Sequence, residues 1–400
     1  MRAVETPPAY PPGTSGTAVV EDPAAFAALE EEWNDLLRDA PLATPYQSWA
    51  WLYSWWENYG GGYRLRLVTV REDGVLVGIV PLMLERRTGR LLFVGSGITN
   101  HLDLLARAGW EERVARAGVE ALRRMASWRV ADLWQLRPGA AAWHLYRAWD
   151  GYGTDVWQAS CHMLDLGAGW DGLLLSLSQK FRGNVRRALR RAEGDGGRWE
   201  PAGPERAEDA ASTLVALHRE SWEGREIGAE HLTRRFEDHL RAAARRMSAR
   251  GFGTVSEFRQ DGEVISSHLV VCGQGLVEGY LGGATREASR RYSVDALRVR
   301  DLASFAEADG LSRVSIGRGE ESYKQRWQPK TEPSRRVILA RDAPFFAAYA
   351  GYQVLQAKAR SYVNSEEAAP WVGKAADRYR SLRSRLGRLR SKAPGMGRRP

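Results

Sequence analysis

Two Asp-Gly pairs interrupt the clearest runs of strand-forming residues in the chain. Each pair separates two short runs rich in β-branched residues. The pairs are Asp73-Gly74, between residues 64–71 and 75–84, and Asp261-Gly262, between residues 254–259 and 264–271. Glycine accepts the positive φ that a tight turn between antiparallel strands requires. The pattern therefore predicts two β-hairpins.

The elements that follow the hairpins also recur. Each hairpin is followed by a helical stretch, a short strand and an arginine-glycine step. The helical stretches are residues 111–125 and 292–309, and the steps are Arg137-Pro138-Gly139 and Arg318-Gly319. This repeat predicts two related units in a mixed α/β (α+β) sheet fold. We name residues 17–165 the first unit and residues 166–342 the second unit, after a disordered segment 1–16 and before a helical, basic extension 343–400.

Further helices and strands are expected from apolar periodicity and its breaks. The helices cover residues 23–39, 49–58, 170–177, 178–191, 205–222 and 229–248, and the strands cover 91–94, 131–136, 154–158, 276–282, 314–316 and 336–340. Several tryptophans in the first half have helical spacing, so we expect them to pack in the core. They are Trp33, Trp49, Trp51, Trp55 and Trp56.

Composition favours a large globular protein. The chain has 400 residues and is 44% hydrophobic, enough for two domains with cores of their own. It contains no uninterrupted apolar run of membrane-spanning length and no apolar signal core near Met1, so we expect a cytoplasmic protein. Cys161 and Cys272 are too few for a disulfide scaffold and have no metal-ligand spacing, so no metal is expected.

The net charge of +9 is unevenly distributed. Residues 374–400 contain ten Lys or Arg and one Asp, with Tyr379, Leu382, Leu386 and Leu389 on one helical face. Such a tail is either a solvated terminus or a peripheral contact with anionic lipid or a polyanion.

A second basic cluster lies on the predicted helix 178–191, which contains no acidic residue. Its members are Lys180, Arg182, Arg186, Arg187, Arg190 and Arg191. Like charges three or four residues apart on a helix repel, so the cluster needs a negative partner. That partner is either a set of acids elsewhere in the fold or an anionic, for instance phosphorylated, substrate, which guanidinium groups bind well.

Six stretches in this order resemble the GNAT acyltransferase superfamily, in particular its tandem CelD-like branch related to FemAB aminoacyltransferases. They are residues 45–51 (PYQSWAW), 78–82 (GIVPL), 100–103 (NHLD), 177–187 (LSQKFRGNVRR), 217–222 (LHRESW) and 317–327 (GRGEESYKQRW). The resemblance implies transfer of an acyl group from acetyl-CoA or another acyl-CoA to an amine or hydroxyl. In the FemAB branch the donor is an aminoacyl-tRNA instead.

Direct acyl transfer needs a base, a donor for the oxyanion and an acid, but no covalent nucleophile. Glu320, Tyr323 and Lys324 follow a strand end through a glycine turn, where α/β sheets commonly place ligand sites. The alternative is an exposed helix start with capping acids. Tyr323 and Lys324 are the preferred contacts to the acceptor or the leaving group.

Two histidines are further catalytic candidates. His218 and Trp222 are four residues apart and share a helix face, which would put a titratable ring beside an aromatic wall at the substrate site. The alternative is a core histidine packed on tryptophan. His268 lies on the second hairpin, on the strand that the resemblance places beside the acyl group.

The resemblance also implies a cofactor loop and a groove between the units. Arg290, Arg291, Tyr292 and Ser293 correspond to the helix start that holds the CoA pyrophosphate, although Val294-Asp295 stands where relatives commonly have Pro-Gly. The first unit looks degenerate. Its His101 and Asp103 either line the groove as substrate contacts or form a loop hydrogen-bond network.

Three functions remain open at this stage. The first is an acyl-CoA-dependent N- or O-acyltransferase acting on a sugar, polysaccharide precursor or other envelope building block. The second is a FemAB-like aminoacyltransferase that uses charged tRNA. The third is a catalytically degenerate scaffold that docks through its basic tail.

Overall fold

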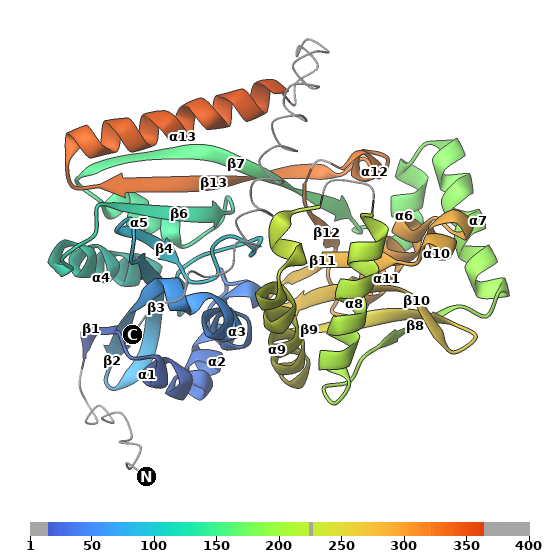
Figure 1. Ribbon diagram of the computed structural model, residues 1–400, viewed down its shortest axis with the longest axis horizontal. Helices are drawn as coiled ribbons and strands as arrows, with labels where there is room; N and C mark the ends of the chain where they lie inside the picture. Colours follow the sequence, from blue (N-terminus) through green and yellow to red (C-terminus); the bar gives the residue numbers. More distant parts are fainter. Residues whose placement is uncertain (1–14, 224–226, 320, 364–400) are drawn as a thin grey trace, which may run out of the picture.

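The computed structural model describes residues 15–223, 227–319 and 321–363. Within them the strands form one 13-stranded mixed sheet, so the predicted mixed α/β fold is confirmed. The strand order is β1-β2-β3-β4-β6-β13-β7-β12-β11-β10-β9-β8, with the short β5 paired to β3. Figure 1 shows this sheet running through both halves of the molecule.

The first unit contributes the following elements, in chain order. They are β1 (Gly16–Val20), α1 (Pro23–Ala28), α2 (Glu30–Arg38), α3 (Trp49–Tyr59), β2 (Tyr63–Glu72), β3 (Val75–Glu85), β4 (Arg90–Phe93), β5 (Leu105–Ala106), α4 (Glu111–Arg124), β6 (Val130–Leu136), α5 (Ala142–Ala148) and β7 (Tyr152–Asp165).

The remainder of the described chain contributes a second, longer set. They are α6 (Gly169–Ser176), α7 (Gln179–Gly194), β8 (Arg198–Pro201), α8 (Ala207–Ser221), α9 (Arg234–Arg250), β9 (Gly253–Gln260), β10 (Glu263–Gly273), β11 (Leu276–Ala284), α10 (Arg286–Arg291), α11 (Val294–Ala308), β12 (Arg313–Arg318), α12 (Ser322–Gln325), β13 (Lys330–Ala340) and α13 (Ala343–Val363).

Both predicted hairpins are confirmed, as β2–β3 and β9–β10. Each Asp-Gly pair has two positive φ angles, 50° and 81° at Asp73 and Gly74, and 51° and 84° at Asp261 and Gly262. This is the backbone of a tight primed turn, whose twist matches that of the strands it joins.

Other predicted elements differ from the structure at their limits. The helix expected at 23–39 is two helices, because α1 ends at Ala28 and Leu29 forms a turn before α2 begins at Glu30. The strand expected at 154–158 extends over all of β7, because it pairs with β12 on one edge and with β13 on the other. The short elements α5 and β8 were not expected, since neither has a clear apolar period.

The two halves share a sheet and part of their core. Strand β13, which is far along the chain, lies between β6 and β7. Helix α3 packs on α9, and Trp51 contacts His239 edge-on at a ring-centroid distance of 4.7 Å. All five tryptophans named above are buried, as expected. The predicted boundary at residue 165 coincides with the end of β7, and the division into domains stays a prediction.

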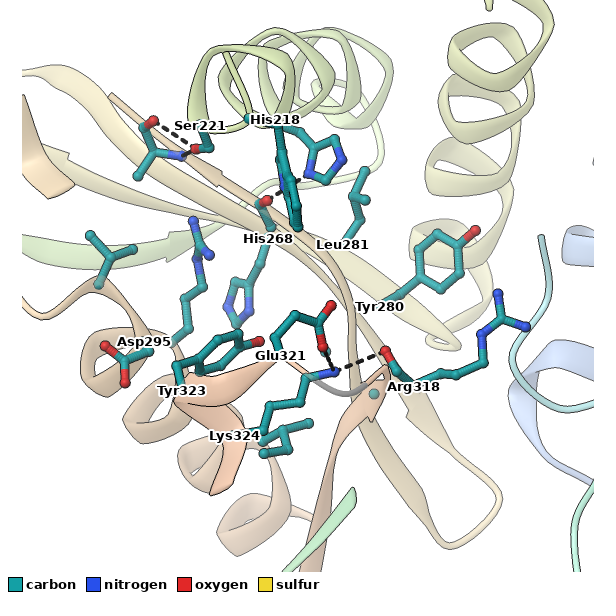
Figure 2. A pocket seen from close by; sticks show the side chains of 18 of the residues that line it. His218, Ser221, His268, Tyr280, Leu281, Asp295, Arg318, Glu321, Tyr323 and Lys324 are labelled. Carbon is teal, nitrogen blue, oxygen red and sulfur yellow. Dashed lines mark hydrogen bonds and ion pairs between the residues drawn. The ribbon is translucent and has the colours of Figure 1, made fainter. Parts of the chain in front are cut away.

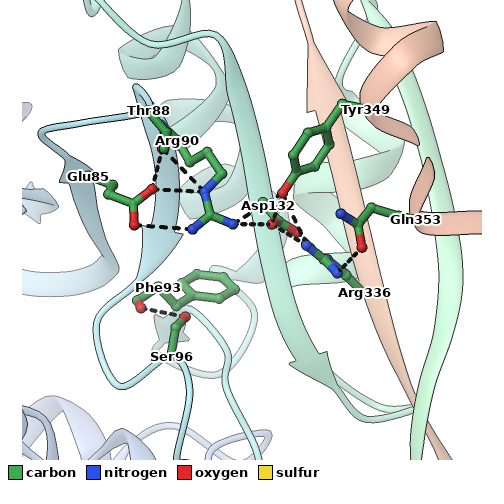
Figure 3. Close-up of polar contacts among 9 residues, drawn as sticks. All are labelled: Glu85, Thr88, Arg90, Phe93, Ser96, Asp132, Arg336, Tyr349 and Gln353. Carbon is green, nitrogen blue, oxygen red and sulfur yellow. Dashed lines mark hydrogen bonds and ion pairs between the residues drawn. The ribbon is translucent and has the colours of Figure 1, made fainter. Parts of the chain in front are cut away.

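A buried carboxylate fixes the C-terminal helix on the sheet (Figure 3). The side chain of Asp132, on β6, is fully buried and pairs with Arg336 from β13 and with Arg90 at 3.6 Å. The hydroxyl of Tyr349, on α13, donates to the same carboxylate at 2.6 Å. Side chains from β4, β13 and α13 therefore converge on one negative charge of β6.

No helix among the described residues is both long and apolar enough to cross a membrane. The predicted basic tail at 374–400 and most of the segment 1–16 lie outside the described residues.

Replacing Asp132 by Asn should strongly destabilise the fold. The change leaves the guanidinium of Arg336 buried without its counter-charge, which typically costs about 3–5 kcal/mol. Urea unfolding of the full chain measures the loss. Asp150→Asn is the control, because its ion pair with Arg123 is exposed and should contribute little. Equal stability of the two variants would contradict the role given to Asp132.

Candidate functional site

A cavity of about 900 Å³ opens in the second unit where two neighbouring strands separate. Strand β11 lies beside β12 in parallel, but in the described sheet they pair at one position, Glu278 with Ser315. Beyond this pair the residues Gly279 to Gly282 line the cavity. One edge of β11 is thus left open to a ligand, as happens where α/β sheets bind theirs.

An irregularity in β11 shapes the same region. The pairing of β10 with β11 shifts between Leu269 and Val270, whose partners are Leu281 and Gly279, so Tyr280 is an extra residue. Such a bulge bends the strand and redirects side chains. The Tyr280 hydroxyl donates to the carbonyl of Ile98 at 2.9 Å, which brings a loop of the first unit to the cavity wall.

Glu278 joins the two units at the point where the strands separate. Its buried carboxylate accepts hydrogen bonds from Tyr46 (2.5 Å) and Asn100 (2.8 Å) of the first unit and from Ser315 (2.5 Å), and it pairs with His101 at 3.2 Å. Burial alone would raise the pKa of Glu278, but His101 and the hydroxyl donors lower it to about 2. Glu278 is therefore a carboxylate at every pH at which the protein is expected to work.

Among the described residues, one group has donor atoms close enough to hold a metal ion. It consists of His101, Cys161 and Glu278, whose ligand atoms lie within 4.8 Å of one another. Both oxygens of Glu278 already accept hydrogen bonds. Burial raises the pKa of the Cys161 thiol to about 12, so the sulfur carries its proton. Hydrogen bonding therefore accounts for this cluster.

Two of the predicted catalytic residues line one side of the cavity (Figure 2). Lys324 is buried, donates to the carbonyl of Arg318 at 2.8 Å and pairs with Glu321 at 2.9 Å. Burial, with a smaller contribution from Glu321, raises the pKa of Tyr323 to about 12. Tyr323 is thus a neutral proton donor. Glu320 lies outside the described residues.

His218 lies on the opposite side of the cavity, on α8 (Figure 2). Its Nδ1 is 2.9 Å from the carbonyl of Gly282, which can only accept, so Nδ1 carries the proton. Burial lowers the pKa of His218, so the ring is neutral and its Nε2 accepts from His231 Nδ1 at 3.0 Å. Trp222 lines the cavity nearby.

The hydrogen bond to His218 also determines which ring nitrogen of His231 carries the proton. Burial, followed by His218, lowers the pKa of His231 to about 4. A neutral ring that donates through Nδ1 has an unprotonated Nε2. His231 lines the cavity, and its Nε2 is the one basic nitrogen of this histidine pair that the pair itself does not use. Its loop position gave no periodic signal in the sequence.

His268 lies on β10 and also lines the cavity. Its Nε2 donates to the carboxylate of Asp301 on α11 at 2.7 Å. Burial lowers the pKa of His268, although Asp301 alone would raise it. The ring is held in one orientation by this pair.

The predicted pyrophosphate loop is largely engaged in contacts within the protein. Arg291 and Tyr292 both bind Asp195, at 2.7 and 2.6 Å, and lie against the end of α7. The Ser293 hydroxyl donates to Asp295 at 2.8 Å. Tyr292, Ser293 and Asp295 line the cavity, and Arg290 is exposed outside its wall. The start of α11 thus faces the cavity but presents a carboxylate there.

The basic residues of α7 lie outside the cavity. Among the described residues, ion pairs are absent from Lys180, Arg182, Arg186 and Arg187. Arg182 and Arg187 instead donate at 3.3 Å to Leu175 and Asn184. Arg191, near the end of the helix, interacts with Asp195, so the four residues without an ion pair all lie before it in α7.

His101 and Asp103 also lie outside the cavity wall. Asp103 is buried and accepts three backbone N–H groups, from Leu104, Ala141 and Ala142, the last two at the start of α5. Burial, opposed by these bonds, raises the pKa of Asp103 to about 7. This is the loop network that was one of its two expected roles.

Comparison with known proteins agrees with this geometry. Residues 179–325 match the family described as acetyltransferase (GNAT) domain, and no curated protein matches the chain. The crystal structure of FemX has a TM-score of 0.58 at 12% identity, covering 80% of this chain and 98% of that one. L-PGS from Bacillus licheniformis has a TM-score of 0.53 at 13% identity, covering 82% and 96%.

These likenesses in structure show a common fold across about four fifths of the chain. The match to the GNAT acetyltransferase domain lies within the second unit, and the expected GNAT-like fold is confirmed. Membership of the CelD-like branch stays a prediction.

Stability at acid pH should depend on Glu278. Its pKa is about 2 in the folded protein and about 4.3 in an unfolded chain, so the folded state binds fewer protons between these values. The stabilisation, about 3 kcal/mol, is present above pH 4.3 and is lost as the pH falls through 2. The free energy of unfolding, measured from pH 6 to 2, should therefore fall less steeply for Glu278→Gln than for the unaltered protein.

Glu112→Gln is the matched control, because Glu112 pairs with Arg116 on an exposed helix face. The free energy of unfolding of Glu112→Gln should fall with pH as steeply as that of the unaltered protein. A Glu278→Gln variant with that same dependence would show that Glu278 does not lock the two units in this way.

Proposed function

We propose that the chain is an acyltransferase that moves an acyl group from acyl-CoA directly to an amine or hydroxyl of a small molecule. The observation that supports this best is the opening between β11 and β12, which places an unpaired strand edge beside Tyr323 and Lys324. An envelope sugar or polysaccharide precursor is the expected class of acceptor.

The residues can be given roles in one balanced step. The acceptor nitrogen or oxygen attacks the thioester carbonyl, and its proton passes to Nε2 of the neutral His231 ring, whose Nδ1 is hydrogen-bonded to His218. Donors on the open edge of β11 or the ammonium of Lys324 stabilise the oxyanion. The carbon–sulfur bond breaks, and Tyr323 returns a proton to the thiolate. The acyl group then remains on the acceptor.

Tyr323→Phe should lower kcat by about 100-fold or more, because it removes the acid for the leaving group. Thiol release from acetyl-CoA, measured with a panel of amines and sugars, gives the rate. Tyr152→Phe, on an exposed residue outside the cavity, should leave it unchanged. Absence of both turnover and acetyl-CoA binding at millimolar concentration would contradict the proposal.

A second candidate donor is aminoacyl-tRNA, and two observations favour it. Asp295 presents a negative charge at the helix start where the CoA phosphates would lie, and Arg291 is already paired with Asp195. Lys180, Arg182, Arg186 and Arg187 on α7 form no ion pair among the described residues, as a polyanion site would require.

Filter binding of tRNA at two salt concentrations separates the donors. If tRNA is the donor, affinity should fall steeply with salt, and Arg186→Glu with Arg187→Glu should weaken it by about tenfold. Arg123→Glu, on α4 of the first unit, is the charge-matched control. Equal weakening by the control, or no binding at low salt, would exclude this candidate.

A further inference from the structure

Arg298 is a cation in the cavity wall that forms no ion pair among the described residues, although Asp295 attracts it from a longer distance. It lies near the start of α11 and lines the cavity wall. Its hydrogen bond from Nη2 to Ser266 Oγ is long, at 3.3 Å. Its Nε is buried and has no hydrogen-bond partner. A buried charge without a partner is costly, so a negative ligand would remove that cost.

The nearby carboxylates are already engaged by other groups. They are Asp295, bound by Ser293 and Arg326; Asp301, bound by His268; and Glu321, bound by Lys324. Burial lowers the pKa of Arg298 to about 10, and the group therefore stays positive at neutral pH. Asp295 offsets this effect only in part, so Arg298 is the cation here that the folded protein leaves without an ion pair.

The surrounding backbone is shaped for this guanidinium. A Cβ at Gly282 would lie 2.7 Å from Arg298 Nη1, so a larger residue at this position would displace the guanidinium from β11. The Ser266 hydroxyl donates to the carbonyl of Gly283 at 3.0 Å, so its oxygen can accept from Arg298. Strand and hydroxyl together fix the guanidinium in place.

Arg298 is also close to the candidate catalytic groups. Its charge contributes to lowering the pKa of both His218 and His268, and it partly offsets the raised pKa of Tyr323. A ligand anion held by Arg298 would therefore place the rest of that ligand beside Tyr323.

We propose that Arg298 binds a carboxylate of the acceptor, so that the molecule acylated by this protein is a carboxylate-bearing amine or alcohol. The inference deepens the proposed function and rests on it. A carboxylate fits better than a phosphate, because a planar monoanion matches a single guanidinium. A dianion would also meet the negative charges of Asp295 and Glu321 on the same cavity wall.

Thermal unfolding of the full chain in sodium acetate, sodium phosphate and sodium chloride at equal ionic strength tests this. Acetate up to about 100 mM should raise the Tm above that in chloride, because a ligand that binds only the folded state stabilises it. Arg298→Met should abolish the response to acetate. In chloride this variant should be at least as stable as the unaltered protein, because it removes a half-buried cation that has no ion pair and whose Nε has no hydrogen-bond partner.

Two further variants complete the test. Arg313→Met removes an exposed arginine that pairs with Glu332 outside the cavity, and it should keep the acetate response. Arg298→Lys, which retains the charge but loses the planar fork, should respond to acetate about tenfold more weakly and provides the measurement if Arg298→Met does not fold.

The inference is overturned if acetate stabilises no more than chloride, or if it stabilises Arg298→Met equally. A response to phosphate but not to acetate also overturns it. The readout needs no acyl donor, so it is independent of turnover. An intact acetate response without thiol release would contradict the acyltransferase proposal alone.

Discussion

The buried carboxylate of Glu278 is the interaction on which the rest of the structure depends. It sits at the one position where β11 and β12 pair, and it accepts hydrogen bonds from both units. A buried charge is stable only when its hydrogen-bonding capacity is filled. The first unit supplies Tyr46, Asn100 and His101 for this purpose, so the second unit cannot complete its own strand junction alone.

This constraint explains where the cavity lies. Pairing stops after Glu278 because the next residues of β11 bulge at Tyr280, and that side chain is directed to Ile98 of the first unit. The same strand has glycine at positions 282 and 283, where the guanidinium of Arg298 and the backbone of α8 approach closely. The cavity is thus a consequence of one strand being held by the other unit.

The features that could be predicted from the sequence are those that depend on residues close together in the chain. The Asp-Gly turns and the helix α7 depend on neighbouring residues, and both formed as expected. The insertion of β13 between β6 and β7 is a long-range pairing that no local pattern encodes. Tyr323, Lys324 and His218 were predicted from short motifs and line the cavity, but their roles stay predictions. The roles proposed for Glu278, His231 and Arg298 depend on partners distant in the chain, so no local motif could indicate them.

The basic residues of the second unit differ in how much they destabilise the folded state. Exposed arginines on α7 are hydrated and repel one another only weakly, so their position says little about a ligand by itself. Arg298 has lost much of its water, has an Nε without a partner and has gained no carboxylate among the described residues. A fold that already pairs Asp295, Asp301 and Glu321 with other groups keeps this guanidinium in a state that only a bound anion would relieve.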